Sequence, residues 1–241
     1  MWHNVLPFAI TFAASVLTTA ATIRAARREG WLVHPRADRW SQSSVAKFGG
    51  VSILATFSMA LIACRVPRPL LTVALLTTAM GIVGLIDDIV QLRPRWKFAA
   101  QFAIAAVAVW SGIVYQLFHV ASLNYGFTFF WILGVTNALN LLDNMDGLAA
   151  GVSVIAASSL LLIGHGSGPM AVGLLVMAAS LLGFLVFNFY PAKIFMGDTG
   201  SLAVGFFLAC CAVSEAGQVS AMFSIVFVPW LVLFLPIFDM L

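Results

Sequence analysis

Nine long apolar runs constrain the fold of this chain more than any other feature. They cover about residues 4–23, 48–64, 69–86, 98–118, 127–141, 148–164, 169–187, 200–214 and 222–240. A helix needs roughly 20 mainly apolar residues to cross the hydrocarbon core of a bilayer. Only 9% of the 241 residues are charged, whereas a soluble domain carries about 25%. We therefore predict an all-α fold, a polytopic membrane bundle of about nine transmembrane helices.

The runs leave no room for a soluble domain or a long linker, so residues 1–241 are predicted to form one transmembrane domain. The runs at 127–141 and 200–214 are short and polar at one end, which predicts tilted, broken or partly re-entrant helices. Arg24, Arg27 and Arg28 follow the first run, and no basic stretch precedes it. This order is typical of a retained first helix and not of a cleaved leader.

The basic residues predict the orientation of the chain. Ten of the twelve Lys and Arg residues fall in loops at about 24–47, 87–97, 142–147 and 188–199, which share one side of the membrane. The positive-inside rule assigns these loops to the cytoplasm and the N-terminus to the outside. The net charge of +3 is modest and fits this topology, so we predict contact with membrane lipid and no nucleic-acid partner.

The acidic residues gather on the same side, which the positive-inside rule does not explain. Asp87, Asp88, Asp143, Asp146 and Asp198 all lie in or beside these loops and next to apolar sequence. A carboxylate in such a place is costly unless it is paired, hydrogen-bonded or bound to a cation. Five such residues on one face predict a shared site.

The adjacent pair Asp87 and Asp88 suits the binding of one divalent ion or of a phosphate-bound proton. Mg²⁺ takes oxygen ligands and keeps waters and substrate phosphates in its shell. A helix end that pairs with the nearby Arg93, Arg95 or Lys97 would explain the two acids equally well. The pair is therefore weak evidence by itself.

The segment 137–147, Asn-Ala-Leu-Asn-Leu-Leu-Asp-Asn-Met-Asp-Gly, is more specific. Asn137, Asn140 and Asn144 are spaced to share one face of a helix, with Asp143 beside them. Gly147 permits a tight turn close to a ligand. Hydrogen bonding between helices is the alternative explanation for the amides, but three amides and two carboxylates within this segment favour a ligand site.

The segment 188–201 is interrupted by Pro191, and Asp198 with Thr199 and Ser201 has the pattern of an N-terminal helix cap. Free N–H groups at such an end favour anions. Lys193, and Lys97 from the earlier loop, suit contact with phosphate. Together the segments predict a site at the membrane surface for a divalent metal and a diphosphate.

Four segments, taken in order, resemble those of the polyprenyl-phosphate N-acetylhexosamine-1-phosphate transferases, the superfamily that includes the phospho-MurNAc-pentapeptide translocases. They are His-Pro-Arg-Ala-Asp at 34–38 through Phe-Gly-Gly at 48–50, Gly-Leu-Ile-Asp-Asp at 84–88, and the segments 137–147 and 188–201. The resemblance runs from about residue 30 to the C-terminus. The segment 137–147 is more similar to the GlcNAc-1-phosphate branch than to the MurNAc-pentapeptide branch.

This resemblance implies transfer of an N-acetylhexosamine 1-phosphate from a UDP-sugar to undecaprenyl phosphate, with release of UMP. It places the reaction on the cytoplasmic face of a bacterial inner membrane, with Mg²⁺, or alternatively Mn²⁺, as cofactor. With the patterns above, it gives catalytic candidates (Asp87, Asp88, Asp143 and Asp146), substrate-binding candidates (Lys97, Asn137, Asn140, Asn188 and Lys193) and metal ligands (Asp143 and Asp198). No Ser or Cys stands out as a nucleophile, so we expect the lipid phosphate to attack directly.

Two departures from the family pattern bear on activity. Gln91 occupies the position of a third acid, and the chain ends where the family has a histidine-rich loop and one or two further helices. We therefore expect a C-terminally shortened member with nine of ten or eleven helices. A catalytically impaired relative that still binds UDP-sugar or lipid is one alternative. A secondary transporter is another, although transporter sites usually lie near the midplane.

The sequence leaves the finer biology open. The sugar is GlcNAc, GalNAc, QuiNAc or FucNAc. The product belongs to a cell-envelope glycan such as an O-antigen, a capsule or a wall teichoic acid. Monomer and homodimer are both compatible with the sequence.

Overall fold

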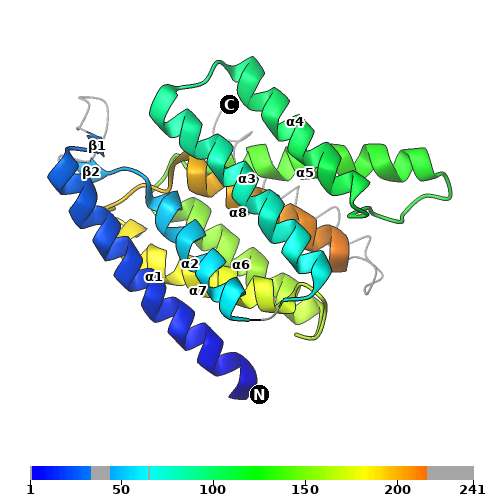
Figure 1. Ribbon diagram of the computed structural model, residues 1–241, viewed down its shortest axis with the longest axis horizontal. Coiled ribbons are helices and arrows are strands. Elements are labelled where there is room, and N and C mark those ends of the chain that lie inside the picture. The colour runs from blue at the N-terminus through cyan, green and yellow to red at the C-terminus, as the bar shows by residue number, and fades with distance from the viewer. Residues whose placement is uncertain (1, 34–43, 65, 216–241) are drawn as a thin grey trace.

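The computed structural model describes residues 2–33, 44–64 and 66–215, which form eight α-helices and one two-stranded sheet (Figure 1). The helices are α1 (Trp2–Glu29), α2 (Gly49–Ala63), α3 (Arg68–Val90), α4 (Pro94–Trp110), α5 (Ala121–Leu142), α6 (Leu148–Ile163), α7 (Ala171–Asn188) and α8 (Gly197–Glu215). Strands β1 (Leu32–Val33) and β2 (Val45–Ala46) pair antiparallel. The all-α prediction is confirmed, and the ninth apolar run at 222–240 lies outside the described residues.

Five of the described helices, α1, α3, α5, α7 and α8, are long and apolar enough to cross a membrane. Helices α2 and α6 are apolar but shorter, with 15 and 16 residues. The chain is therefore a multi-pass membrane protein. The prediction of nine spans is met only in part by the described residues.

The boundaries of α4 and α5 differ from the predicted ones. Helix α4 ends at Trp110 and not near residue 118, whereas α5 begins at Ala121, before the predicted 127. The polar residue Asn124 explains the second difference, because its side chain serves the helix start. Its Oδ1 accepts from the Phe118 N–H at 2.8 Å, and its Nδ2 donates to the Phe118 carbonyl at 2.9 Å. Both α5 and α8 are continuous helices, so the predicted breaks are absent.

Helix α8 is the centre of the bundle. It contacts α2, α3, α5 and α6, and nearly every residue from Thr199 to Glu215 is buried (Figure 1). A helix that is apolar on all sides packs inside a protein and not at its surface. The N-terminus of α8 is therefore surrounded by other helices, and the groups that they carry there meet.

Small residues let α2 and α3 come close to this N-terminus. A Cβ atom on Gly50 would lie 2.1 Å from the Gly200 nitrogen, and one on Gly84 would lie 2.2 Å from the Asp198 carbonyl oxygen. Packing of this kind is common between membrane helices, because small residues allow backbones to approach. Gly84 lies one helical turn before the two acids at the end of α3.

The segment 44–50 runs beside the loop 193–197 that leads into α8. The Phe195 N–H donates to the Ala46 carbonyl at 3.0 Å, and the Gly49 N–H donates to the Phe195 carbonyl at 2.9 Å. These backbone hydrogen bonds join β2 and the start of α2 to the residues just before α8. The sheet therefore lies next to the helix end where the acids gather.

Candidate functional site

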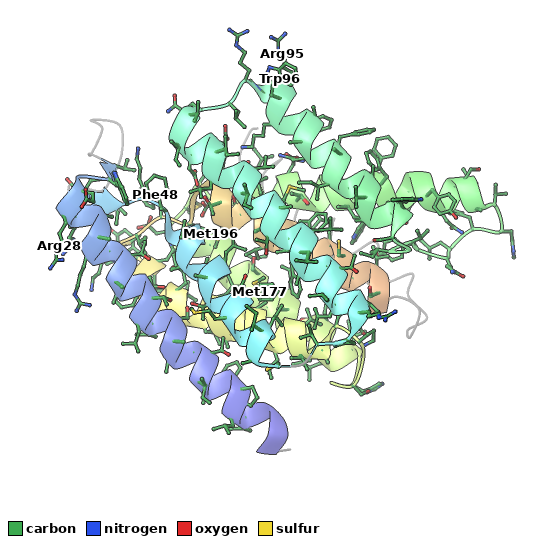
Figure 2. The ribbon with its side chains drawn as sticks, in the orientation of Figure 1. Arg28, Phe48, Arg95, Trp96, Met177 and Met196 are labelled. Atoms are coloured by element: carbon green, nitrogen blue, oxygen red, sulfur yellow. The ribbon has the colours of Figure 1, made fainter. Side chains whose placement is uncertain are left out.

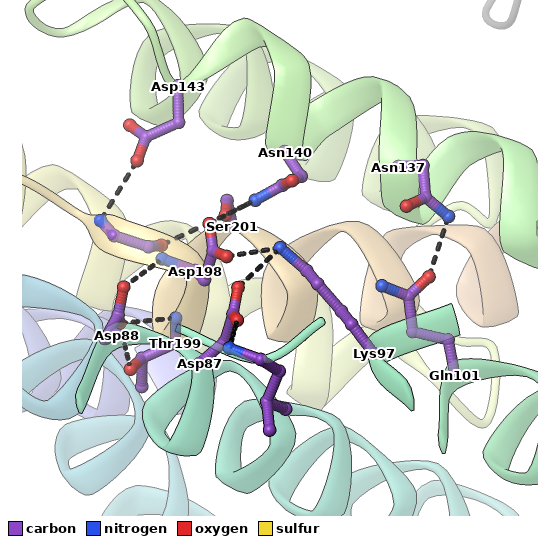
Figure 3. A network of polar contacts seen from close by, with 12 residues as sticks. Asp87, Asp88, Lys97, Gln101, Asn137, Asn140, Asp143, Asp198, Thr199 and Ser201 are labelled. Carbon is purple, nitrogen blue, oxygen red and sulfur yellow. Dashed lines mark hydrogen bonds and ion pairs between the residues drawn. The ribbon is translucent and has the colours of Figure 1, made fainter. Parts of the chain in front are cut away.

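The predicted acids converge at the N-terminus of α8, as Figure 3 shows. Asp87 and Asp88 come from the last turn of α3, Asp143 directly follows α5, and Asp198 is in the first turn of α8. Segments that lie far apart in the sequence therefore bring four carboxylates together. The prediction of a shared acidic cluster is confirmed for these four residues.

The carboxylate of Asp88 caps α8. Its Oδ1 accepts from the Asp198 N–H at 3.0 Å, and its Oδ2 accepts from the Thr199 N–H at 2.9 Å and the Thr199 hydroxyl at 2.6 Å. The first N–H groups of a helix have no partner within the helix, so a carboxylate there satisfies them and stabilises the positive end of the dipole. The predicted capping role of Asp198 is therefore wrong, because the cap comes from another helix.

The side chain of Asp198 faces a lysine and an asparagine instead. Lys97 Nζ lies 2.9 Å from Asp87 Oδ2 and also pairs with Asp198 Oδ2 (Figure 3). Asn140 Nδ2 donates to Asp198 Oδ1 at 2.7 Å and to Ser201 Oγ at 2.8 Å. The Lys97 ammonium thus bridges α3 and α8, and all these side chains are only partly buried.

Asp143 approaches the same turn from the other side, where its Oδ2 accepts from the Gly197 N–H at 3.0 Å. Burial raises the pKa of the Asp143 carboxyl to about 8, from an ordinary 3.8. The Gly197 N–H opposes this rise, and the charges of Asp198 and Asp88 add to it. A nearby cation would remove the cost of ionising this carboxyl.

A cavity of about 590 Å³ opens over the cluster. Its described lining includes the acids Asp87, Asp88, Asp143, Asp146 and Asp198, the amides Asn140, Asn144, Asn188 and Gln91, and Lys47 with the aromatic side chains of Phe48 and Phe195. The volume suits a ligand of nucleotide size. The cavity is thus lined both by the carboxylates and by residues of segment 44–50.

Two lining residues from the predicted set also hold the loops around the cavity. Asn188 Nδ2 donates to the Ile194 carbonyl at 2.9 Å, and its Oδ1 accepts from the Gly147 N–H at 3.2 Å. Asp146 Oδ2 accepts from the Ala192 N–H at 2.9 Å. These contacts join the loop after α5 to the loop after α7.

Two other predicted residues, Lys193 and Asn137, lie outside the cavity lining, and Asn144 lines the cavity but leaves its predicted helical face. Lys193 is exposed and is absent from the cavity lining. Asn137 faces Gln101 on α4, with Asn137 Nδ2 2.8 Å from Gln101 Oε1 (Figure 3). Asn144 follows the end of α5 and is exposed, so it does not continue the helical face of Asn137 and Asn140.

Sequence reasoning missed Gln101 and Lys47. Gln101 is buried and lies one helical turn after Lys97 on α4, so a spacing of four residues from a candidate lysine was the available signal. Lys47 immediately precedes the Phe-Gly-Gly stretch at 48–50, whose resemblance to the family was noted. Its position on the cavity wall depends on the pairing of segment 44–50 with the loop before α8.

The cluster suits a divalent cation, because its carboxylates outnumber the ammonium groups that pair with them. Asp87, Asp88, Asp143 and Asp198 meet at the start of α8, and the one ammonium group that pairs with members of this cluster among the described residues is that of Lys97, on Asp87 and Asp198. Among the described residues, no three His, Cys, Asp or Glu side chains could hold a metal ion by themselves. Mg²⁺ does not need three, because it usually binds one or two carboxylates and completes its shell with water and substrate phosphates.

Comparisons with known proteins identify the family of this chain. Residues 70–216 match the glycosyl transferase family 4. The chain is 34% identical to a probable undecaprenyl-phosphate N-acetylglucosaminyl 1-phosphate transferase of Bacillus subtilis (strain 168), over 99% of this chain and 70% of the relative. It is also 34% identical to a phospho-N-acetylmuramoyl-pentapeptide-transferase of Staphylococcus carnosus (strain TM300), over 72% of this chain and 62% of the relative.

The matched range contains α5, α8 and all but the first two residues of α3, the three helices whose ends bring the acidic cluster together. The chain spans 70% and 62% of the lengths of the two relatives, so part of each relative has no counterpart here. The similarity extends to relatives of both branches and agrees with the resemblance found in the four sequence segments. This multi-pass membrane protein of bacterial type belongs to the glycosyl transferase family 4.

Proposed function

We propose that this protein transfers an N-acetylhexosamine 1-phosphate from a UDP-sugar to undecaprenyl phosphate and releases UMP. The observation that carries this proposal is the meeting of Asp87, Lys97 and Asp198 with Asp143 beside a cavity of about 590 Å³. Phosphoryl transfer depends mainly on positioning and on electrostatic stabilisation of phosphate oxygens. The two relatives described above carry names of the same reaction class.

In this proposal, an oxygen of the lipid phosphate attacks the sugar-linked phosphorus of the UDP-sugar. The bond between that phosphorus and the bridging oxygen of the diphosphate breaks, and the oxygen leaves with UMP. The product is an undecaprenyl diphosphate sugar. Because the lipid phosphate supplies the attacking oxygen, no covalent intermediate on the protein is needed.

The residues have separate roles in this scheme. Asp143 and Asp198 would hold Mg²⁺, which would neutralise phosphate charge and help to orient the two substrates when bound. Lys97 orients the Asp87 and Asp198 carboxylates, because its ammonium bridges them. Asn140 fixes the second oxygen of Asp198 through its hydrogen bond. Asp88 holds the start of α8 against the end of α3 through its hydrogen bonds.

The orientation of the chain is part of the proposal. The basic residues around the acidic face, including Arg24, Arg27 and Arg28, support a cytoplasmic position for the site and an outer position for the N-terminus. A cytoplasmic site would have direct access to nucleotide sugars. Undecaprenyl phosphate would approach within the membrane and present its head group at the same level.

The experiment is a UMP-release assay in detergent, with UDP-GlcNAc, undecaprenyl phosphate and Mg²⁺. We expect turnover that stops when the metal is chelated and falls by at least about 100-fold in Asp198→Ala, in line with the loss of a charge-stabilising group. Glu29→Ala is the matched control, because Glu29 is an exposed acid outside the cavity lining. Turnover that persists in Asp198→Ala would refute the proposed site, and binding of UDP-GlcNAc without any turnover would refute the activity.

A further inference from the structure

Lys47 is the basic residue among the described lining residues of the acidic cavity, which otherwise presents five aspartates. Its side chain is exposed and lies on the wall formed by segment 44–50. The acids come from the ends of α3, α5 and α8 and from the loop after α5. A ligand in the cavity would therefore meet an ammonium group as well as carboxylates.

The ammonium of Lys47 is available to a ligand in a way that the ammonium of Lys97 is not. Both ion pairs of the described residues belong to Lys97, which bridges Asp87 and Asp198. A lysine held by two carboxylates has little capacity left for a further anion. Lys47 has no such partner in the described part of the chain, so its charge is free to act on a phosphate.

The backbone around Lys47 is held firmly. The Lys47 N–H donates to the Trp31 carbonyl at 3.1 Å, and the flanking residues Ala46 and Gly49 are hydrogen-bonded to Phe195. Between them, Phe48 has a φ of 68°, in the left-handed region that bulky residues rarely adopt. Unfavourable conformations of this kind persist where the surrounding structure enforces them, and they cluster at functional sites.

The neighbours of Lys47 also indicate how deep it lies in the membrane. Trp31 follows the end of α1, is 50% exposed and packs edge-on against Phe48 with ring centroids 5.6 Å apart. Tryptophans at the ends of membrane helices lie at the level of the lipid head groups. Lys47 is joined to this tryptophan by its backbone, so its ammonium lies near the level at which a lipid-borne phosphate would enter.

We propose that the Lys47 ammonium binds a phosphoryl group of a substrate in this cavity. This inference rests on the proposed function, which supplies two such groups, the diphosphate of the nucleotide sugar and the phosphate of the acceptor lipid. Five carboxylates would repel either group. Lys47 compensates for this repulsion because its ammonium lines the same cavity.

The test compares Lys47→Gln with Lys47→Arg and with Arg28→Gln as the matched control. Arg28 is exposed and projects outward from the end of α1, outside the cavity lining (Figure 2). A hydrogen bond to a charged group contributes about 1.5–3 kcal/mol, which corresponds to a loss of roughly 10- to 100-fold in apparent affinity. We expect this loss in Lys47→Gln and its recovery in Lys47→Arg.

The Michaelis constants for UDP-GlcNAc and undecaprenyl phosphate, measured separately, distinguish the two phosphates. A rise for the lipid alone would assign Lys47 to the acceptor phosphate, and a rise for the nucleotide alone would assign it to the diphosphate. The melting temperature in detergent checks that Lys47→Gln is folded. Constants within twofold of those of Arg28→Gln, for both substrates, would overturn the proposal.

Measurements of direct ligand binding distinguish a failure of this inference from a failure of the proposed function. Dissociation constants for UDP-GlcNAc and for undecaprenyl phosphate are measured by calorimetry with wild-type protein and with Lys47→Gln. If the wild type shows no turnover, the proposed activity fails, but a 10-fold or greater weakening of one ligand in Lys47→Gln would still support phosphate binding by Lys47. Equal binding of both ligands by the two proteins would refute it.

Discussion

Substitution of Gly84 by alanine should separate α3 from α8 and disable the site without touching any acid. The added Cβ would lie 2.2 Å from the Asp198 carbonyl oxygen, 2.4 Å from the Asp198 carbonyl carbon and 2.6 Å from the Thr199 nitrogen. Ordinary contact begins at 3.4 Å, so α3 has to retreat by about 1.2 Å. All three neighbours are backbone atoms, so no rotation of a side chain can relieve the overlap.

The retreat would act on the two acids one turn further along α3. The hydrogen bonds from Asp88 to the start of α8 are 2.6–3.0 Å long, and an added ångström would break or weaken them. Overpacking costs about 1–3 kcal/mol, and loss of a helix cap costs about a further 1 kcal/mol. A displacement of about 1 Å at a catalytic group costs on the order of 100-fold in rate.

The assay measures thermal unfolding in detergent and UMP release on the same samples. Gly151→Ala is the control, because Gly151 is also within a helix but a Cβ there would have nothing within 4 Å. Alanine at such a site should be neutral or stabilise the protein by up to about 1 kcal/mol. If Gly84→Ala were as stable and as active as Gly151→Ala, the close approach of α3 to α8 would not be what positions the acids.

Three further changes probe the same site. Asp88→Asn should lower the unfolding free energy by about 1–3 kcal/mol, because the amide NH2 would face the N–H groups of α8, which need an acceptor. Asp87→Asn should reduce UMP release with a smaller loss of stability, and a larger loss of thermal stability in Asp87→Asn than in Asp88→Asn would contradict this. Gln101→Leu should lower turnover by about tenfold, because the link between α4 and α5 is lost one turn from the bridging lysine; unchanged turnover would argue against a positioning role. Mg²⁺ affinity, measured by calorimetry, should fall by about tenfold per pH unit below pH 8, because the metal displaces the proton of Asp143. This pH dependence should be lost in Asp143→Asn, and a pH dependence that persists in that variant would belong to another group.

The sequence was sufficient to predict which acids meet. A carboxylate next to an apolar run is costly wherever it lies in the membrane, and the alternation of loops assigned all five to one side. Four of them, Asp87, Asp88, Asp143 and Asp198, surround the N-terminus of α8. The prediction succeeded because it needed only the order of the helices and not their packing.

The partners of these acids were not predictable in the same way. The pattern of Asp198, Thr199 and Ser201 is that of a local cap, yet the cap is supplied by Asp88 from 110 residues away. Local propensity shows that a helix begins at that point, but it does not identify which side chain satisfies the free N–H groups. Gln101 likewise has a recognisable role only once α4 lies against α5.

The ends of the helices were also poorly defined by hydropathy. The apolar run at 98–118 continues past Trp110, where α4 ends, because Ile113 and Tyr115 are buried outside any helix. The Tyr115 N–H there donates to the Thr128 hydroxyl of α5 at 2.9 Å. Burial of irregular backbone against another helix is compatible with apolar sequence, so an apolar run does not show where a helix stops.

The two adjacent aspartates of α3 illustrate how neighbours in sequence acquire different tasks. Successive residues of a helix point about 100° apart, so one pair of acids can serve two partners. Asp88 accepts three hydrogen bonds from the first turn of α8, so both of its carboxylate oxygens are occupied in holding that helix. Asp87 instead faces Lys97, whose ammonium it shares with Asp198. In our proposal we therefore expect Asp87 to be the member of the pair that takes part in chemistry, and Asp88 to hold the helix that carries the proposed metal ligand Asp198.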